Sequence, residues 1–220
     1  VVPGNGGGNG RVNCISFHPT DLNTFWIGAP NGGIWKTTDG GNSWISLNDN
    51  LITNISIADI AVDPLYPDTL YIATGDGYGY EVENIFWGGT YSAGVLKSTD
   101  GGVTWNSTGL TYLQSQNNIV QRVVVCSANP QVLLASARDG LWRSADGGST
   151  WIKVQTSQYY DIKFNTANDS IVYAASGYEV YKSTDLGLTW TEISAGLNPS
   201  GGRVSLATTA ANPQVIYAFC

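Results

Sequence analysis

An eight-residue motif occurs four times in this chain, with the pattern [ST]-x-D-x-G-x-[ST]-W. The copies occupy residues 37–44, 98–105, 144–151 and 183–190. The Asp of the motif can accept hydrogen bonds from backbone N–H groups, the Gly can take a positive φ, and the Trp can pack back across a hairpin. Each copy is therefore predicted to form a strand, a tight turn and a second strand. Four copies in 220 residues indicate a repeat protein.

The residues before the motif repeat as well. Two apolar or aromatic residues and then a base precede every copy: Ile34-Trp35-Lys36, Val95-Leu96-Lys97, Leu141-Trp142-Arg143 and Val180-Tyr181-Lys182. A matching pair of β-branched or aromatic runs, bounded by turn residues, comes before each of these hairpins. The paired runs are 12–17 and 24–27, 57–62 and 70–73, 121–126 and 133–135, and 161–164 and 172–174. Each repeat is thus predicted to hold four strands.

The spacing of the motif aspartates gives the size of the repeat. Successive aspartates are separated by 61, 46 and 39 residues. The two shorter intervals match a four-stranded propeller blade of about 40–45 residues, and the first interval is one blade with an insertion. The predicted fold class is all-β: a β-propeller of four-stranded blades, with four blades and the start of a fifth.

The predicted boundaries follow from these runs. Residues 1–10 form a flexible Gly-rich leader, and residues 11–220 form a partial propeller. The blades are expected at about 11–48, 57–108, 119–155 and 159–194, with a partial blade at 203–220. A propeller closes on itself to remove its outer sheet edges. We therefore expect the remaining blades to come from the same protein or from another chain.

The motif resembles the Asp-box, or bacterial neuraminidase (BNR), repeat. Families with this box include sialidases, sortilin-type receptors and xyloglucanase-type glycoside hydrolases. The chain is also similar to secreted bacterial propellers, including exported proteins of Bacteroidetes, at 10–13, 32–36 and 73–76. The motif turn is expected at the outer rim of each blade, and an active site needs one arrangement of groups, not four copies. We therefore expect structural roles for the motif aspartates Asp39, Asp100, Asp146 and Asp185 and for the motif tryptophans Trp44, Trp105, Trp151 and Trp190.

The resemblance does not supply a complete catalytic site. In xyloglucanase-type enzymes an Asp acts as base before a Gly-Gly pair in the first blade, whereas Asn31 stands at the matching position here. Asn cannot ionise. A sialidase needs an arginine cluster, and no such cluster is evident among Arg11, Arg122, Arg138, Arg143 and Arg203. No catalytic residue is assigned, although acids in other blades remain possible.

One long loop is the candidate ligand site. The segment 75–94, between the predicted second and third strands of blade two, has about 20 residues where the other repeats use about five. Loops of such length are usually functional or mobile. Aromatic faces beside carboxylates suit a sugar ring. The predicted ligand-binding residues are Asp76, Tyr78, Tyr80, Trp87 and Tyr91. Packing of these aromatics on a neighbouring blade is the alternative.

Other constellations point to no cofactor and no metal. His18 is the sole histidine and precedes Pro19 in a predicted turn, so a structural role is expected. Asp76, Asp139 and Glu179 fall in comparable loops, where a shared cation is the alternative to separate solvated acids. Cys14, Cys126 and Cys220 lie in different predicted blades and imply no disulfide framework, so buried free thiols are expected.

The amino-acid composition limits the classes of binding partner that we expect for this chain. The net charge of −7 and the lack of a basic stripe argue against nucleic acid. No apolar run reaches the roughly 18 residues of a membrane span. With charged residues at 12%, the composition agrees with an extracellular or cell-surface address. We expect a carbohydrate- or protein-binding propeller module. The alternatives are a xyloglucanase-type hydrolase with acids partly outside this segment, and a structural repeat of a surface adhesin.

Overall fold

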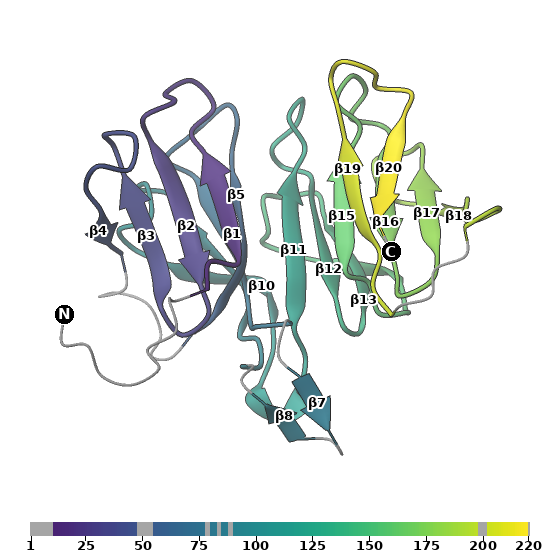
Figure 1. Ribbon diagram of the computed structural model, residues 1–220, viewed down its shortest axis with the longest axis horizontal. Coiled ribbons are helices and arrows are strands. Elements are labelled where there is room, and N and C mark those ends of the chain that lie inside the picture. Colours follow the sequence, from purple (N-terminus) through teal and green to yellow (C-terminus); the bar gives the residue numbers. More distant parts are fainter. Residues whose placement is uncertain are drawn as a thin grey trace.

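The computed structural model describes residues 11–47, 55–77, 80–82, 85–87, 90–197 and 202–219 of the chain. Its described part consists of β-strands and one short 3-10 turn, η1 (Gln114–Gln116). Most strands lie side by side along a common axis and form successive sheets (Figure 1). Four sheets have four strands each and are called blades 1 to 4, and a two-stranded sheet that follows them is called the half-blade.

The strand bounds follow in chain order. Blade 1 holds β1 (Cys14–Phe17), β2 (Phe25–Ala29), β3 (Gly33–Thr37) and β4 (Ile45–Ser46). Blade 2 holds β5 (Ile57–Val62), β6 (Leu70–Thr74), β9 (Gly94–Ser98) and β10 (Asn106–Thr111). Blade 3 holds β11 (Val120–Val125), β12 (Leu133–Ala137), β13 (Gly140–Ser144) and β14 (Ile152–Gln155). Blade 4 holds β15 (Asp161–Phe164), β16 (Val172–Ala175), β17 (Val180–Ser183) and β18 (Thr191–Glu192). The half-blade holds β19 (Ser205–Thr208) and β20 (Ile216–Phe219).

Within each blade the strands pair antiparallel in chain order. The predicted hairpins around the four motifs are confirmed, since each motif joins the third strand of its blade to the fourth. The first strands of successive blades contact one another, from β1 through β5, β11 and β15 to β19. The first strands therefore form the inner edge of an arc, and the motif turns lie between the third and fourth strands toward its outer rim. This is the predicted propeller architecture, and it fits a segment of a larger ring.

The core lies between the blades. The second strands β6 and β12 are buried along their whole length, which is expected for strands covered by a neighbouring blade on each face. One buried cluster joins Tyr71, Val95, Val123 and Leu133 across blades 2 and 3. The largest fully buried side chains include Trp26, Tyr71 and Tyr159. Each aromatic of this size removes on the order of 150–250 Å² from water, so the blades are held together mainly by apolar burial.

The long segment between β6 and β9 differs from the expectation. The sequence predicts a loop there, but the structure contains a paired hairpin, β7 (Tyr80–Val82) and β8 (Ile85–Trp87). This hairpin lies beyond the ends of the blade strands, at the bottom of Figure 1. Paired strands satisfy the backbone polar groups of an excursion that would otherwise depend on water. The end of the blades from which β7 and β8 extend is called the loop end.

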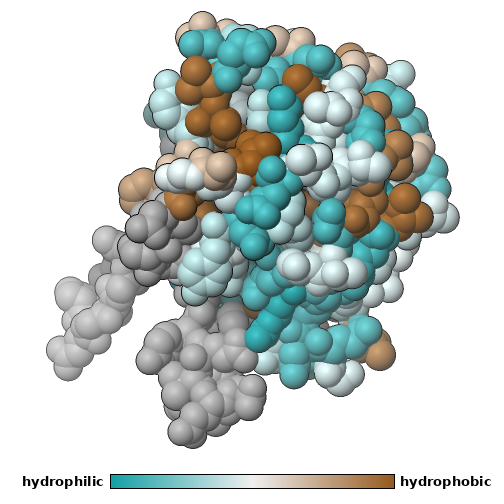
Figure 2. Space-filling view, turned by 90° about the vertical axis from the view of Figure 1, so that its right-hand side faces the viewer, coloured by the Kyte–Doolittle hydropathy of each residue, from teal (hydrophilic) through white to brown (hydrophobic). Residues whose placement is uncertain are grey.

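The half-blade lies at the right of Figure 1, the side that faces the viewer in Figure 2. Hydrophobic side chains occur there in separate groups among hydrophilic ones (Figure 2). Tyr217 and Phe219 of β20 are exposed, by 59% and 79%. Among the described strands, β20 pairs with β19 alone. On blade 1, at the other end of the arc, Ile15 and Phe17 of β1 are exposed as well. The predicted leader at residues 1–10 lies outside the described residues.

Candidate functional site

Each motif aspartate uses its carboxylate inside its own turn. In blade 1 the backbone N–H of Ser43 donates to Asp39 Oδ1 over 2.9 Å, and the Ser43 hydroxyl donates to Asp39 Oδ2 over 2.6 Å. The hydroxyl of Thr37 donates to Asp39 Oδ1 over 2.8 Å. The corresponding bonds recur between Thr104 and Asp100, Thr150 and Asp146, and Thr189 and Asp185. Four separate and similarly bonded turns favour an architectural role.

These hydrogen bonds also change the acidity of the carboxyl groups. Donation from the Ser43 hydroxyl, and then from the Ser43 backbone N–H, lowers the pKa of Asp39 to about 2. Thr104 and Thr150 do the same for Asp100 and Asp146, whose pKa values also fall to about 2. A general acid works best with a pKa near the operating pH. These carboxyl groups are therefore poorly suited to protonate a leaving group at neutral pH.

The motif tryptophans close their hairpins. The indole N–H of Trp151 donates to the Gly148 carbonyl over 3.0 Å, and that of Trp190 donates to the Gly187 carbonyl over 3.1 Å. Trp44 packs edge-on against Phe25 in blade 1, with ring centroids 5.3 Å apart. In all three cases the ring returns to its own blade.

In blades 2 and 3 the base before the motif donates a hydrogen bond to the next blade. Lys97 Nζ donates to the Gly147 carbonyl over 3.1 Å, and Arg143 Nε donates to the Leu186 carbonyl over 2.9 Å. Gly147 and Leu186 each follow the aspartate of a motif, as does Gly101, whose carbonyl accepts a bond from Trp26 Nε1 over 3.2 Å. We call these hydrogen bonds to the residue after the motif aspartate the interblade contacts. The interblade contacts of Lys97 and Arg143 give the base at this position a structural role, since it joins neighbouring blades.

At the loop end an ion pair joins an exposed arginine of the segment before β1 to a buried carboxylate of blade 2. Asp76, which follows β6, has a fully buried side chain and pairs with Arg11 Nη2. The Asp76 backbone N–H donates to the Thr90 carbonyl over 2.8 Å, which ties together the two chain segments that lead to the β7–β8 hairpin. The Arg11 side chain is 44% exposed, and its Nε donates to Asn13 Oδ1 over 2.9 Å. The guanidinium thus connects a buried carboxylate to the surface.

This geometry changes the role expected for Asp76. The sequence predicts a ligand-binding or solvated acid at this position, but the carboxylate has no exposed surface. Burial beside a cation explains the difference, because a buried carboxylate needs a charged or hydrogen-bonding partner. The exposed group of the pair is Arg11, which is not among the ligand-binding residues predicted from the sequence.

The aromatic part of the predicted site is described in part. Tyr91 is half-buried beside the Thr90 anchor. The backbones of Tyr80 and Trp87 lie opposite each other in the β7–β8 pair. Tyr78 and the side chains of Tyr80 and Trp87 lie outside the described residues, so their contact with a ligand stays a prediction.

Asn31 occupies the position matched to a catalytic base. Its backbone has φ 54°, in the left-handed region that Asn tolerates. The Ser56 hydroxyl lies 3.3 Å from Asn31 Oδ1 and accepts from the Asn31 backbone N–H over 3.2 Å. The amide is therefore held in a neutral hydrogen-bonded arrangement between blades 1 and 2.

The acids of the corresponding loops in blades 3 and 4 are engaged separately. Asp139 accepts from the Tyr112 hydroxyl over 2.8 Å and from Lys153 Nζ over 2.7 Å. Glu179 accepts from the Tyr181 hydroxyl over 2.7 Å. Burial and the bond to Asp139 raise the pKa of Tyr112 above its usual range. Across the described ranges, no three His, Cys, Asp or Glu side chains are grouped so that they hold a metal ion.

A chain of charges links the inner strands. Arg122 of β11 lies between Asp59 of β5 and Asp161 of β15, at 3.4 Å from each carboxylate. Asp59 also accepts from the Val123 N–H over 3.2 Å. Burial raises the pKa of Asp59, and the nearby Arg122 opposes that rise. This network connects three successive blades.

Two cavities lie away from the loop end. A cavity of about 330 Å³ lies between the outer strands of blade 2 and the motif turn of blade 3. We call it the rim cavity. A second, of about 390 Å³, lies between turns of blades 3 and 4 and includes Asp169, which accepts from the Ser127 hydroxyl over 2.7 Å and from the Ala128 N–H over 2.6 Å. The sequence pattern predicts neither cavity, because each is formed between blades.

The lone histidine and the cysteines behave as expected of structural residues. His18 Nδ1 accepts from the backbone N–H of Asp21 over 3.0 Å inside its turn. Cys14 and Cys126 are buried and free, and burial raises the pKa of both thiols. Cys220 lies outside the described residues. In the part of the chain that the structure describes, no helix is long and apolar enough to cross a membrane.

The fold defines this chain as a segment of a β-propeller. Solved structures of similar fold support this assignment. The fold of this chain is similar to that of the family GH74 xyloglucanase from Xanthomonas campestris, with a TM-score of 0.66 and 24% identity over 91% of this chain and 32% of that one. A GH74 enzyme from Niastella koreensis gives a TM-score of 0.62 at 24% identity, over 91% of this chain and 32% of that chain.

Curated relatives are similar in sequence. The chain is 30% identical over 161 residues to the xyloglucanase Xgh74A of Acetivibrio thermocellus, which covers 69% of this chain and 18% of that protein. It is 31% identical over 159 residues to a xyloglucanase of a Paenibacillus species, which covers 68% of this chain and 15% of that protein. The chain thus matches less than a fifth of the length of these relatives. No family model matches the chain.

Proposed function

We propose that this chain is a polysaccharide-binding segment of a β-propeller and that its loop end holds a xyloglucan-type glucan. The observation that carries the proposal is the Arg11–Asp76 pair at the base of the β7–β8 excursion. A fully buried carboxylate orients a guanidinium that is 44% exposed. A guanidinium has five N–H donors in a fixed plane, which suits the hydroxyl and ring oxygens of a sugar.

The aromatic residues of the excursion supply the second requirement. A sugar ring presents apolar C–H faces together with hydroxyl edges, so a glycan site combines aromatic surface with polar groups. Trp87 and Tyr91 are proposed to provide that surface, with Tyr78 and Tyr80 beside them. Asp76 acts through Arg11 in this proposal and does not touch the glycan.

The relatives favour a glucan over a protein partner. The similar curated proteins are named xyloglucanases, and solved structures with this fold include a GH74 xyloglucanase. Xyloglucan is an extracellular polymer, so we propose that the protein is exported or displayed at the cell surface. The motif turns are proposed to be Asp-boxes with a structural role. The remaining blades are proposed to come from the same or another chain.

Hydrolysis is the second candidate, and Asn31 counts against a complete active site in this segment. Glycoside hydrolysis needs two carboxyl groups, about 5–5.5 Å apart for retention or about 6.5–9.5 Å for inversion. The neutral amide of Asn31 stands where one acid is expected. A hydrolase built from this segment therefore needs acids from other parts of the protein.

Affinity electrophoresis tests the binding proposal. The chain is expected to migrate more slowly in gels that contain xyloglucan than in gels that contain unbranched mannan of similar viscosity. A mobility unchanged by xyloglucan would contradict the proposal. Release of reducing ends from xyloglucan by this chain would instead favour the hydrolase candidate.

A further inference from the structure

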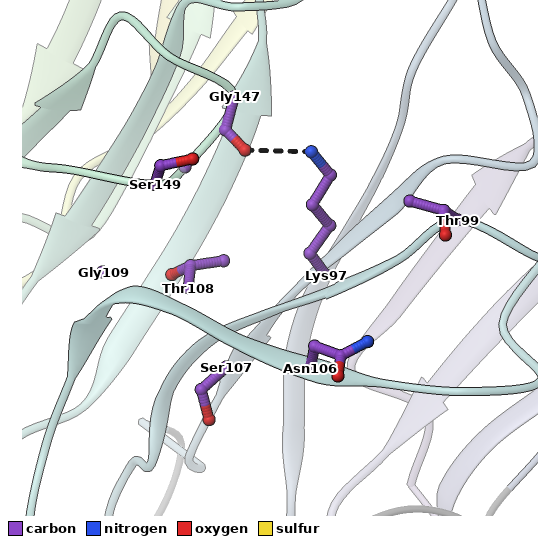
Figure 3. A pocket seen from close by; sticks show the side chains of 9 residues that line it. Lys97, Thr99, Asn106, Ser107, Thr108, Gly109, Gly147 and Ser149 are labelled. Atoms are coloured by element: carbon purple, nitrogen blue, oxygen red, sulfur yellow. Dashed lines mark hydrogen bonds between the residues drawn. The ribbon is translucent and has the colours of Figure 1, made fainter.

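The rim cavity is a second polar site, distinct from the loop end. Its lining residues come from β9, β10 and the motif turns of blades 2 and 3: Lys97, Thr99, Asn106, Ser107, Thr108, Gly109, Gly147, Gly148 and Ser149. Lys97 reaches across it to the Gly147 carbonyl, with Thr108 and Ser149 on one side of the lysine in the view and Thr99 on the other (Figure 3). Its volume of about 330 Å³ is near the lower end of the range for ligand pockets, about 300–1,000 Å³.

The neighbouring blade junctions carry apolar residues at the matching positions. Three residues after the motif Trp, Leu47 of blade 1 lies against Gly102 of blade 2, where an added Cβ would approach its Cδ1 to 2.8 Å. Thr108 holds that position at the rim cavity. One residue after the motif Trp, blades 1 and 3 have Ile45 and Ile152, each more than half exposed, whereas blade 2 has Asn106. At the rim cavity the small polar Thr108 thus replaces the apolar filler that Leu47 supplies between blades 1 and 2, and the space is left open.

Several polar groups of the cavity remain available to a ligand. Thr108 donates its hydroxyl to the Val95 carbonyl, and Ser149 donates to the Asp146 carbonyl. Within the described part of the chain, by contrast, the side chains of Thr99, Asn106 and Ser107 make no hydrogen bond and lie in exposed positions. Two hydroxyls and an amide therefore line a cavity whose other polar side chains are already bonded.

The charge of the lining indicates the class of ligand. Lys97 is its one charged residue, and the lining includes no Asp or Glu. The ammonium has three donors, of which one is bonded to Gly147, and it lies 5.3 Å from the centre of the Tyr71 ring. An ammonium beside these hydroxyls matches a small molecule that carries one carboxylate and several hydroxyls.

We propose that the rim cavity binds a hydroxylated carboxylate of the size of a uronic acid. The carboxylate lies at Lys97, and Thr99, Asn106 and Ser107 bind the ring hydroxyls. A uronic acid can be a side group of a plant polysaccharide, but this site is independent of the glucan proposal, because none of its residues belongs to the loop end.

Isothermal titration with three probes tests the ligand class. Glucuronate carries both features, glucose keeps the hydroxyls without the charge, and acetate keeps the charge without the ring. Glucuronate is expected to bind at least about tenfold more tightly than either of the other two. Equal affinity for glucose, equal affinity for acetate, or no glucuronate binding would each overturn the proposal.

Matched variants locate the site. Lys97→Met and Lys36→Met each remove a base that precedes a motif, but Lys97 alone lines the cavity. Lys97→Met is expected to weaken glucuronate binding at least about tenfold, and Lys36→Met to leave it unchanged. Asn106→Ile introduces the residue found at the matching position of blades 1 and 3 and is expected to weaken binding while the melting temperature is kept. Thr191→Ile, at the matching position of blade 4, is its control. An equal loss in both members of a pair would show that the effect does not come from the cavity.

Discussion

Lys97 Nζ in blade 2 lies 3.1 Å from the carbonyl oxygen of Gly147 in the motif turn of blade 3 and 5.3 Å from the centre of the Tyr71 ring. The Tyr71 hydroxyl donates to the same carbonyl over 3.1 Å. Two side chains outside the motif of blade 3 thus bind a backbone carbonyl of that motif. Each of these two repeats is therefore stabilised in part by hydrogen bonds to the other.

Replacement of Lys97 by Met is expected to lower the free energy of unfolding by about 1–2 kcal/mol, since it removes one hydrogen bond from a charged donor and one cation–π contact. Lys36→Met should cost less, because Lys36 lies over the Trp26 ring but, among the described residues, makes no hydrogen bond like that of Lys97 to Gly147. Urea denaturation followed by tryptophan fluorescence measures both values. A larger loss for Lys36→Met than for Lys97→Met would contradict the assignment.

Substitutions in the charge network of the inner strands should lower the free energy of unfolding further. Arg122→Met removes the cation that lies between Asp59 and Asp161. Asp161 keeps its ion pair with Lys163 at 3.2 Å, but Asp59 loses its nearest cation, at a cost of about 2–4 kcal/mol. Addition of Asp59→Asn to this variant should recover part of the loss, because one buried charge is removed. Equilibrium unfolding measures the free energy of unfolding of the single and double variants and so tests this recovery. If the double variant is less stable than Arg122→Met, the network does not act as described.

A steric test separates two glycines with similar backbone conformations. Gly94 has φ 106°, and an added Cβ would lie 2.0 Å from the Leu110 carbonyl oxygen. Gly196 has φ 89°, with nothing within 4 Å of the added atom. Gly94→Ala is expected to cost at least about 2 kcal/mol more than Gly196→Ala, because overpacking adds to the backbone strain that both share. Similar melting temperatures for the two variants would argue against the close approach of β10 to β9.

The motif aspartates predict an acid-sensitive fold. Asp39, Asp100 and Asp146 have pKa values of about 2 in the folded chain, against about 3.9 for an unfolded Asp. Because the folded pKa is depressed, the stabilisation is complete above pH 4 and is lost as the pH falls from about 4 toward 2. The melting temperature of Asp146→Asn should fall less over this range than that of the native chain. Parallel curves for the two proteins would refute the prediction.

The sequence predicts the blades better than it predicts the surfaces between them. Strand hairpins around Asp39, Asp100, Asp146 and Asp185 follow from local turn chemistry, which a linear pattern records. The burial of Asp76 depends on Arg11, 65 residues away, and no local signal reports that contact. The predicted loop between β6 and β9 proved to contain a hairpin, since its short strands lack the long alternating pattern of the blade strands.

The rim cavity shows the same limit. Asn106 and Thr108 look like ordinary strand residues in the sequence. Their effect appears when the structure places them against Gly148 and Ser149 of the next blade. Comparison of matching positions among the four repeats is the signal that points to the cavity, since Ile and Leu occupy those positions in blade 1.

Glycan binding at the loop end is the central feature of the proposed function. The most direct measurement is isothermal titration of xyloglucan oligosaccharides into the native chain, Trp87→Ala and Tyr66→Ala. Tyr66 is 67% exposed in the turn between β5 and β6, at the opposite end of blade 2, and serves as the matched aromatic control. Trp87→Ala is expected to weaken binding by at least about tenfold with nearly unchanged melting temperature, and Tyr66→Ala to bind like the native chain. Absence of binding by the native chain, or equal binding by all three proteins, would contradict the proposed function.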